Sequence, residues 1–314
     1  MRVFVDTDPG IDDAVALAYL TALPEVDIVG VGAVFGNNPV DVTTDNASRL
    51  MHLFGRPTVP VARGAAGPLV GPAAFAEHVH GMNGLGEVET PPAREGAVPG
   101  SAAELLVQLA RVAPGEIDVL VLGTLTNVAL ALAIEPELPR LLGRVVIMGG
   151  AVTAPGNTTP WAESNIHKDP EAAERVLAAG FDTTLVTLDV TMRTLATQPW
   201  LDRLSRVQGT RAEFCAKFLE FYVGHYSTEV FGHTACAMHD PLAAAILVDQ
   251  SLVVAERQRP VRVELTGTHT RGMTIADLRP TPAPEERPTV RLPTEVATEE
   301  FLERLLRALA TDVP

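Results

Sequence analysis

The chain has 314 residues, of which 46% are hydrophobic, and this length allows one large domain or two smaller ones. Its 24 basic and 39 acidic residues give a formal net charge of −15, which disfavours nucleic acid and anionic membranes as partners. No zinc pattern surrounds Cys215 and Cys236, no apolar run is long enough for a membrane span, and no secretory signal is visible, so we expect a cytoplasmic protein.

Short apolar runs alternate with helical patterns along the first part of the chain. We predict strands at residues 2–6, 27–35 and 58–62, and helices at residues 12–23 and 40–54. The run 14–20 is too rich in alanine for a strand, which favours the helix there. Residues 63–100 are rich in glycine and proline and are predicted to be mostly loop.

The alternation continues in the rest of the chain. A helix over 101–112 is predicted to begin with a capping box, in which Ser101 and Glu104 each bind the other's backbone N–H. Further strands are predicted at 118–122, 144–148, 184–189 and 261–265, and further helices at 126–134, 169–179, 210–223, 240–247 and 299–309. Residues 282–293 are interpreted as a proline-rich surface connection. Strands that alternate with helices predict an α/β fold with a largely parallel sheet.

Four carboxylates, Asp6, Asp8, Asp12 and Asp13, fall within eight positions directly after the first predicted strand. Keeping them all ionised in a partly buried site is costly unless a cation neutralises them. Ligands that are all oxygens favour Ca²⁺ or Mg²⁺ over zinc. Asp12 and Asp13 alone are equally well explained as acids at a helix N-terminus, but that does not account for the other two. The cluster therefore predicts a metal site or a catalytic site.

Polar residues follow other predicted strands as well, at 36–38, 123–127 and 148–150. Ligands of open α/β sheets bind at the carboxyl ends of the strands, so these positions are candidates for the same site. Two more candidates are His239-Asp240-Pro241, which in isolation is explained as a helix start, and the polar loop containing Glu163 and Asn165.

The segment from Asp6 to Ala14 resembles the DxDPGxDDA signature of the inosine–uridine-preferring nucleoside hydrolases. Other motifs follow in the family's order, namely Gly36-Asn37, His80 with Asn83-Gly84-Leu85-Gly86, Leu125-Thr126-Asn127, Met148-Gly149-Gly150, Asn157, Glu163, Asn165 and His239-Asp240. The resemblance covers nearly the whole chain. It implies a single domain over residues 1–314, with a Rossmann-like core in which helices flank a mixed, mainly parallel sheet, and it implies a homodimer or homotetramer.

The resemblance implies Ca²⁺-dependent hydrolysis of the N-glycosidic bond of ribonucleosides to ribose and a free purine or pyrimidine base, as in nucleoside salvage. The implied metal ligands are Asp8, Asp13, Asp240 and a backbone carbonyl near Leu122. Asp8 is also the expected general base, which activates a calcium-bound water. The residues expected to hold the sugar are Asp12, Asn37, Asn157, Glu163 and Asn165, with Met148 beneath the ribose. On the base side, the expected residues are His239 as the acid, Tyr222 and Tyr226 as assisting or stacking residues, and His80 as a ligand contact. Asp6 is expected to support the others.

Two positions depart from the family pattern, and both lie on the sugar side of the expected pocket. Ser164 stands where the family often has an aromatic residue, and the segment from Gly149 to Asn157 is one residue longer. A non-catalytic calcium-dependent protein that binds nucleosides or sugars could share every ligand residue.

A second alternative is a Mg²⁺-dependent phosphatase of the haloacid-dehalogenase type, with Asp6 as the nucleophile. That interpretation leaves Asp12, Asp13 and the later His239-Asp240 pair unexplained, and Pro9 stands where its motif prefers Thr or Val.

Overall fold

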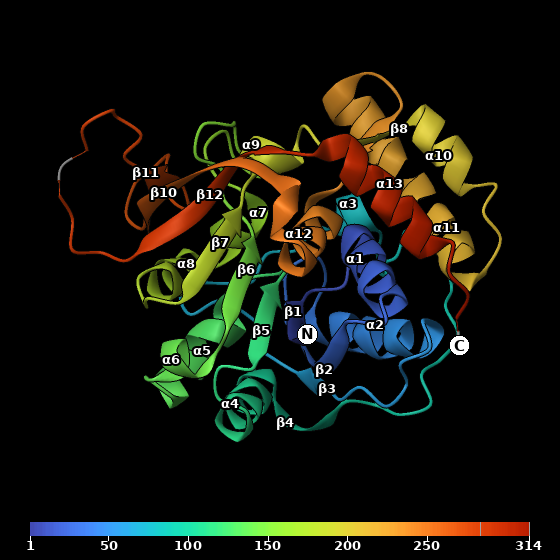
Figure 1. Cartoon of the computed structure of the whole chain (residues 1–314), viewed down its shortest axis with the longest axis horizontal. Coiled ribbons are helices and arrows are strands. Elements are labelled where there is room, and N and C mark those ends of the chain that lie inside the picture. The colour runs from blue at the N-terminus through green and yellow to red at the C-terminus, as the bar shows by residue number, and fades with distance from the viewer. Residues whose placement is uncertain (283, 314) are drawn as a thin grey trace.

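A ten-stranded sheet runs through the computed structural model, which describes residues 1–282 and 284–313 apart from the side chain of Thr228 (Figure 1). In spatial order the strands are β11 (Thr274–Ala276), β10 (Val253–Val263), β12 (Thr289–Val296), β7 (Asp182–Val186), β6 (Arg144–Met148), β5 (Ile117–Val121), β1 (Arg2–Thr7), β2 (Asp27–Ala33), β3 (Val61–Arg63) and β4 (Val98–Ser101). Neighbours from β12 to β4 are parallel, whereas β10 is antiparallel to β12 and β11. The predicted mixed, mainly parallel sheet is confirmed.

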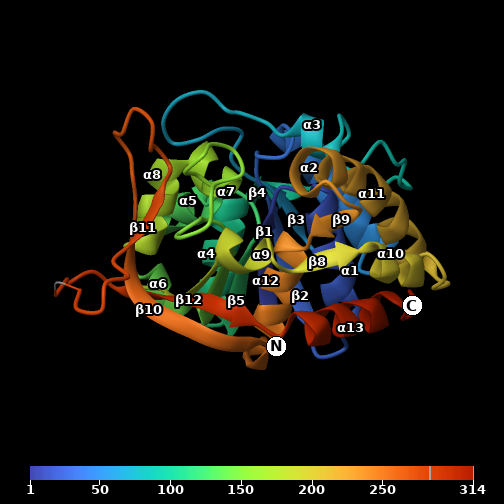
Figure 2. The ribbon, with the colours of Figure 1, turned by 90° about the horizontal axis from the view of Figure 1, so that it is seen from above.

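Two groups of helices cover the two faces of this sheet (Figure 1 and Figure 2). One face carries α1 (Ile11–Ala22), α2 (Val40–Leu53), α11 (Thr210–Tyr226), α12 (His239–Val248) and α13 (Thr298–Leu309), and the other carries α4 (Ala102–Val112), α5 (Thr126–Ile134) and α8 (Pro170–Leu177). Because side chains alternate along a strand, Val3 and Val5 of β1 join the first core while Phe4 joins the second. Among the described residues, none of the helices is both long and apolar enough to cross a membrane.

Several short elements were not predicted from the sequence. They include β11 and, in chain order, α3 (Glu77–His80), α6 (Leu138–Leu141), α7 (Ser164–Lys168), α9 (Leu188–Thr191), α10 (Gln198–Leu204), the small antiparallel pair β8 (Leu195–Thr197) and β9 (Ala235–Ala237), the π-helix η1 (Ser227–Phe231) and the 3₁₀-helix η2 (Gln250–Leu252). The stretch predicted to be mostly loop contains α3 and all of β4 except its last residue. The capping box of Ser101 and Glu104 is confirmed. Cys215 and Cys236 are free and buried.

The interpretation of residues 282–293 as a surface connection was wrong in its second half, because β12 begins at Thr289. Pro293 lies opposite Glu256 of β10, while the pairing of β12 with β7 is at Arg291 and Thr184. Pro293 has no N–H to donate to a neighbouring strand, and the pairing of β12 with β7 lies two residues before it. Similarly, β10 begins at Val253, well before residue 261. The prediction missed its first half because residues 254–258 are exposed and show no buried face. Residue 283 of the predicted connection lies outside the described residues.

Arg211 of α11 is a buried cation that links the ends of neighbouring helices by hydrogen bonds. Its guanidinium donates hydrogen bonds to the carbonyl oxygens of Thr21 (3.1 Å) and Phe54 (3.2 Å), at the ends of α1 and α2. It also donates to the carbonyls of Thr311 (3.0 Å) and Asp312 (2.7 Å), after α13. The side chain thus joins three helix ends that lie far apart in the sequence.

We expect Arg211→Met to lower the free energy of unfolding by about 2–4 kcal/mol, because buried carbonyls lose their donor. Urea denaturation followed by circular dichroism measures this change. Arg203→Met is the matched control, since its guanidinium pairs with Glu303 at the surface and such pairs contribute about 1 kcal/mol or less. Equal losses for the two variants would contradict the role given to Arg211.

Candidate active site

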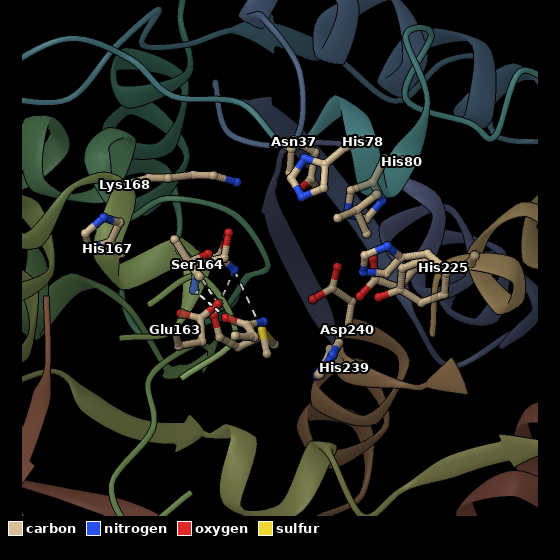
Figure 3. Close-up of a pocket in the computed structure, with 18 of the residues that line it drawn as sticks. Asn37, His78, His80, Glu163, Ser164, His167, Lys168, His225, His239 and Asp240 are labelled. Atoms are coloured by element: carbon tan, nitrogen blue, oxygen red, sulfur yellow. Dashed lines mark hydrogen bonds between the residues drawn. The ribbon is translucent and has the colours of Figure 1, made fainter. Parts of the chain in front are cut away.

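The carboxyl ends of β1, β2, β5 and β6 lead to one cavity of about 490 Å³ (Figure 3). The predicted site residues that line it are Asp12, Asn37, His80, Leu122, Met148, Asn157, Glu163, Asn165, Tyr222, Tyr226, His239 and Asp240. Asp8 and Asp13 are fully buried behind this lining, where both contact Asn37. Residues from more than two hundred positions apart are thus brought to one place, as the resemblance implied.

Three carboxylates meet where two helices begin. Asp12 and Asp13 lie in the first turn of α1 and Asp240 lies in the first turn of α12, and their oxygens are within 4.8 Å of one another. Helix N-termini favour negative charge, which explains in part why the acids are placed there. Burial, then repulsion from Asp13, raises the pKa of Asp12 to about 7, and burial with the neighbouring acids raises the pKa of Asp240 well above its usual range. A cation at this point would relieve both costs.

Asp8 follows β1 and occupies a space that two glycines leave open. One carboxylate oxygen accepts the backbone N–H of Asn37 at 2.7 Å, and the other is buried without a hydrogen-bond partner among the described residues. A Cβ at Gly123 would lie 2.6 Å from that second oxygen, and a Cβ at Gly36 would collide with the first. Burial, then repulsion from Asp13, raises the pKa of Asp8, while the ammonium of Lys168 opposes the rise. The unpartnered oxygen fits a metal ion or an attacking water.

The two remaining acids of the N-terminal cluster are held by different partners. Asp13 accepts the N–H of Gly10 at 3.0 Å and the side-chain amide of Asn37 at 3.2 Å. Asp6 accepts the side-chain amide of Asn127 at 2.7 Å and is absent from the residues that line the cavity. Burial raises the pKa of Asp6 to about 7. This placement agrees with a supporting position for Asp6.

Glu163 stands at the opposite wall of the cavity, as the N-cap of α7. Its carboxylate accepts the backbone N–H groups of Gly150 (3.0 Å), Asn165 (2.8 Å) and Ile166 (3.1 Å). These bonds favour the ionised form, although burial still raises the pKa of Glu163. The capping geometry fixes the carboxylate, since its two oxygens are held from three directions.

The side chain of Asn165 donates to the carbonyl of Leu122 at 2.6 Å, and the side-chain oxygen of Asn157 accepts the N–H of Ser164 at 2.9 Å. A carbonyl oxygen has two lone pairs, so the bond from Asn165 leaves Leu122 one pair for a further ligand. The wall formed by α7 is therefore built from amide and carboxylate side chains that are held by backbone groups.

Aromatic rings and histidines form the other side. The rings of Tyr222 and Tyr226 are 4.8 Å apart between centroids, and Tyr222 is 5.6 Å from His80. His239 contacts the Tyr226 hydroxyl through Nε2 (2.6 Å) and the Thr191 hydroxyl through Nδ1 (2.7 Å). Burial lowers the pKa of His239 to about 4, so its imidazole is neutral near pH 7. Figure 3 shows His80 and His225 across the cavity from Glu163 and Ser164.

Sequence reasoning missed three residues of this site. Thr191 and Lys168 carry no motif of their own. Thr191 belongs to the site through its contact with His239, and Lys168 lines the cavity directly. Asn127 belongs to a motif that was noted, but its bond to Asp6 was not foreseen. The available signal was that Asn127 had no assigned role while Asp6, a buried acid, had no assigned partner.

The chain is similar in sequence and in structure to known nucleoside hydrolases. The inosine-uridine preferring nucleoside hydrolase family matches residues 3–303. The inosine-uridine preferring nucleoside hydrolase of Crithidia fasciculata is 38% identical over 286 residues, which cover 90% of each chain. The pyrimidine-specific ribonucleoside hydrolase RihA of Klebsiella pneumoniae is 35% identical over 310 residues, 99% of this chain and 98% of the relative. A solved structure of a purine-preferring ribonucleoside hydrolase from Gardnerella vaginalis superposes with a TM-score of 0.92 at 30% identity, covering 99% of this chain and 98% of that one.

Fold and family together define an N-glycosyl hydrolase. The chain belongs to the inosine-uridine preferring nucleoside hydrolase family, and the resemblance inferred from the motifs is confirmed. A phosphatase of the haloacid-dehalogenase type is thereby ruled out as the family of this protein. The relatives carry names with purine, pyrimidine and mixed preferences, so membership of the family leaves the preferred base open.

Proposed function

We propose that this chain, as one domain over residues 1–314, hydrolyses ribonucleosides to ribose and a free purine or pyrimidine base with Ca²⁺ as its cofactor. The observation that carries the proposal is the meeting of Asp12, Asp13 and Asp240 beside the unpartnered oxygen of Asp8. Keeping these buried carboxylates ionised is costly unless a cation neutralises them, and they include the acids of the family signature.

The donor set fits Ca²⁺, which prefers six to eight oxygen ligands in flexible geometry. Asp8, Asp13, Asp240 and the carbonyl of Leu122 would hold the ion, and each of them supplies oxygen. When bound, Ca²⁺ lowers the pKa of a water and aligns the 2′,3′-diol of a ribose. The chain's own residues then carry out the proton transfers and bind the sugar.

Asp8 is proposed as the general base that takes a proton from the attacking water. Its support is the carboxylate oxygen that has no hydrogen-bond partner among the described residues, while the other oxygen accepts the N–H of Asn37. The sugar would lie between this group and the wall of α7, in contact with Asp12, Asn37, Asn157, Glu163 and Asn165, above Met148. Their carboxylates would stabilise the positive charge that develops on the sugar in an oxocarbenium-like transition state.

A site that binds two sugar hydroxyls should reject a sugar that lacks one of them. We expect kcat/KM for 2′-deoxyribonucleosides to be lower than for the matching ribonucleosides by about a hundredfold or more. Release of each free base, followed by chromatography, gives the comparison. Similar rates on both sugars would contradict the proposed role of the diol.

The departing base needs a proton, and Tyr226 with His239 is the proposed source. His239 is neutral near pH 7, and both of its nitrogens contact hydroxyls. In the tautomer with a proton on Nε2, His239 donates to the oxygen of Tyr226, whose own proton is then free to reach the base. His239 would thus act as an acid indirectly, by supporting proton donation from Tyr226. Tyr222 and His80 complete the aromatic wall against the base.

Tyr226→Phe tests this assignment with two leaving groups. We expect kcat on ribonucleosides to fall by about a hundredfold, because the base leaves without a proton. Cleavage of p-nitrophenyl riboside should change by about threefold or less, because nitrophenolate leaves without protonation. A similar loss on both substrates would mean that Tyr226 acts on the sugar or on the fold instead.

A further inference from the structure

Lys168 is a buried cation in the cavity that the proposed mechanism does not use. It is the last residue of α7, is 8% exposed, and lines the cavity with Asn157 and Glu163. In Figure 3 its side chain extends from the α7 wall toward the open centre, between Asn37 and Ser164.

The ammonium of Lys168 has no hydrogen-bond partner in the described part of the chain. The neighbouring carboxylate of Asp169 is engaged elsewhere, by the Thr126 hydroxyl (2.7 Å) and the N–H groups of Leu69 (3.0 Å) and Ala172 (3.1 Å). An ammonium carries three donors, and burying it unpartnered is costly. The position therefore calls for a partner that enters the cavity.

The surroundings of Lys168 indicate the chemistry of that partner. Lys168 lines the same cavity as Glu163 of the α7 wall and as Asp12 and Asp240 of the acid cluster. Burial lowers the pKa of Lys168, and the charges that counteract this most are Asp8 and then Glu163. Carboxylates only accept hydrogen bonds and an ammonium only donates them. A hydroxyl between Glu163 and Lys168 can satisfy both, by donating to the first and accepting from the second.

We propose that Lys168 is a further substrate-binding residue that donates a hydrogen bond to the 5′ oxygen of the ribose. The proposal rests on the proposed function, in which the 2′ and 3′ oxygens are taken up by the acid cluster. The remaining hydroxyl of the sugar is then the one that faces α7, where Glu163 and Lys168 stand at the two ends of one short helix. Because this hydrogen bond requires the 5′ oxygen, the enzyme should prefer nucleosides that carry a 5′-hydroxyl.

The test compares wild-type protein and Lys168→Met on a ribonucleoside and on its 5′-deoxy counterpart. Met keeps the length of the side chain and removes only the charge and the donors. We expect kcat/KM on the ribonucleoside to fall about 10- to 100-fold, which is the value of a hydrogen bond to a charged group. On the 5′-deoxy substrate the variant should stay within about threefold of wild type.

Equal losses on both substrates would overturn the proposal, because a general counter-charge for Asp8 does not discriminate between them. An unchanged rate on the ribonucleoside would overturn it as well. Lys168→Gln, which keeps a neutral donor, should show a smaller loss with the same selectivity. The circular dichroism spectrum of Lys168→Met should match that of wild type, which checks the fold without depending on turnover. A wild-type protein that cleaves no ribonucleoside would contradict the proposed function itself, whereas an active wild type with an unselective variant would contradict the role of Lys168 alone.

Discussion

Asp8→Asn is expected to reduce ribonucleoside hydrolysis by about a thousandfold or more while the protein remains folded. The variant keeps the shape of the side chain and its contact with the N–H of Asn37. It removes the carboxylate that would take the proton from water, together with one negative ligand of the proposed ion. Steady-state ribose release, with circular dichroism as the folding check, measures the effect.

Asp6→Asn is the matched control for this variant. Asp6 lies two residues away and is equally buried, and it accepts a hydrogen bond from Asn127 that an amide oxygen can also accept. Because burial raises the pKa of Asp6 to about 7, an uncharged group is already accommodated there. We expect a change of about fivefold or less. Retained turnover in Asp8→Asn would contradict the assigned base.

Asp240→Asn is expected to weaken Ca²⁺ binding by about a hundredfold or more, because the centre loses one negative oxygen ligand. Isothermal titration of the chelator-treated protein with Ca²⁺ gives the affinity without depending on turnover. Asp249→Asn is the control at the other end of α12, where the carboxylate pairs with Arg304 instead of facing the cavity. Equal affinities of wild type and Asp240→Asn would contradict the proposed ligand set.

The same titration should depend on pH in a defined direction. Burial and mutual repulsion raise the carboxyl pKa values of the cluster, that of Asp12 to about 7. Protons therefore occupy the metal-free centre near neutral pH, and a cation must displace them. As pH falls through 7 the protonated form gains, so the apparent affinity should be about tenfold lower at pH 6 than at pH 8 for each proton displaced.

The parts of the fold that sequence could predict are those whose signal is local. Strand 144–148 is found with its predicted bounds, and the capping box at Ser101 was visible because its two partners lie three residues apart. By contrast, β8 and β9 are three residues each and exist because they pair with one another across the chain. The first half of β10 is largely exposed, so no alternation of buried and exposed residues marks it.

The candidate site follows the same division. Asp8, Asp12 and Asp13 were predicted because they lie within six positions of the sequence. Asp240 was predicted because its motif follows the others in the family's order. Lys168 was missed, because whether a lysine points to solvent or to a cavity depends on how α7 packs. Charges that cluster in the sequence can therefore be predicted, whereas a single residue that joins the site only through tertiary packing cannot.

The most direct test of the central claim is a reducing-sugar assay across the common ribonucleosides, with Ca²⁺, with a calcium chelator, and with Ca²⁺ restored. We predict ribose release from at least one ribonucleoside, its loss with the chelator, and its recovery when Ca²⁺ is returned. Tight nucleoside binding without ribose release would instead identify a non-catalytic binding protein. Release that is unaffected by the chelator would contradict the dependence on Ca²⁺.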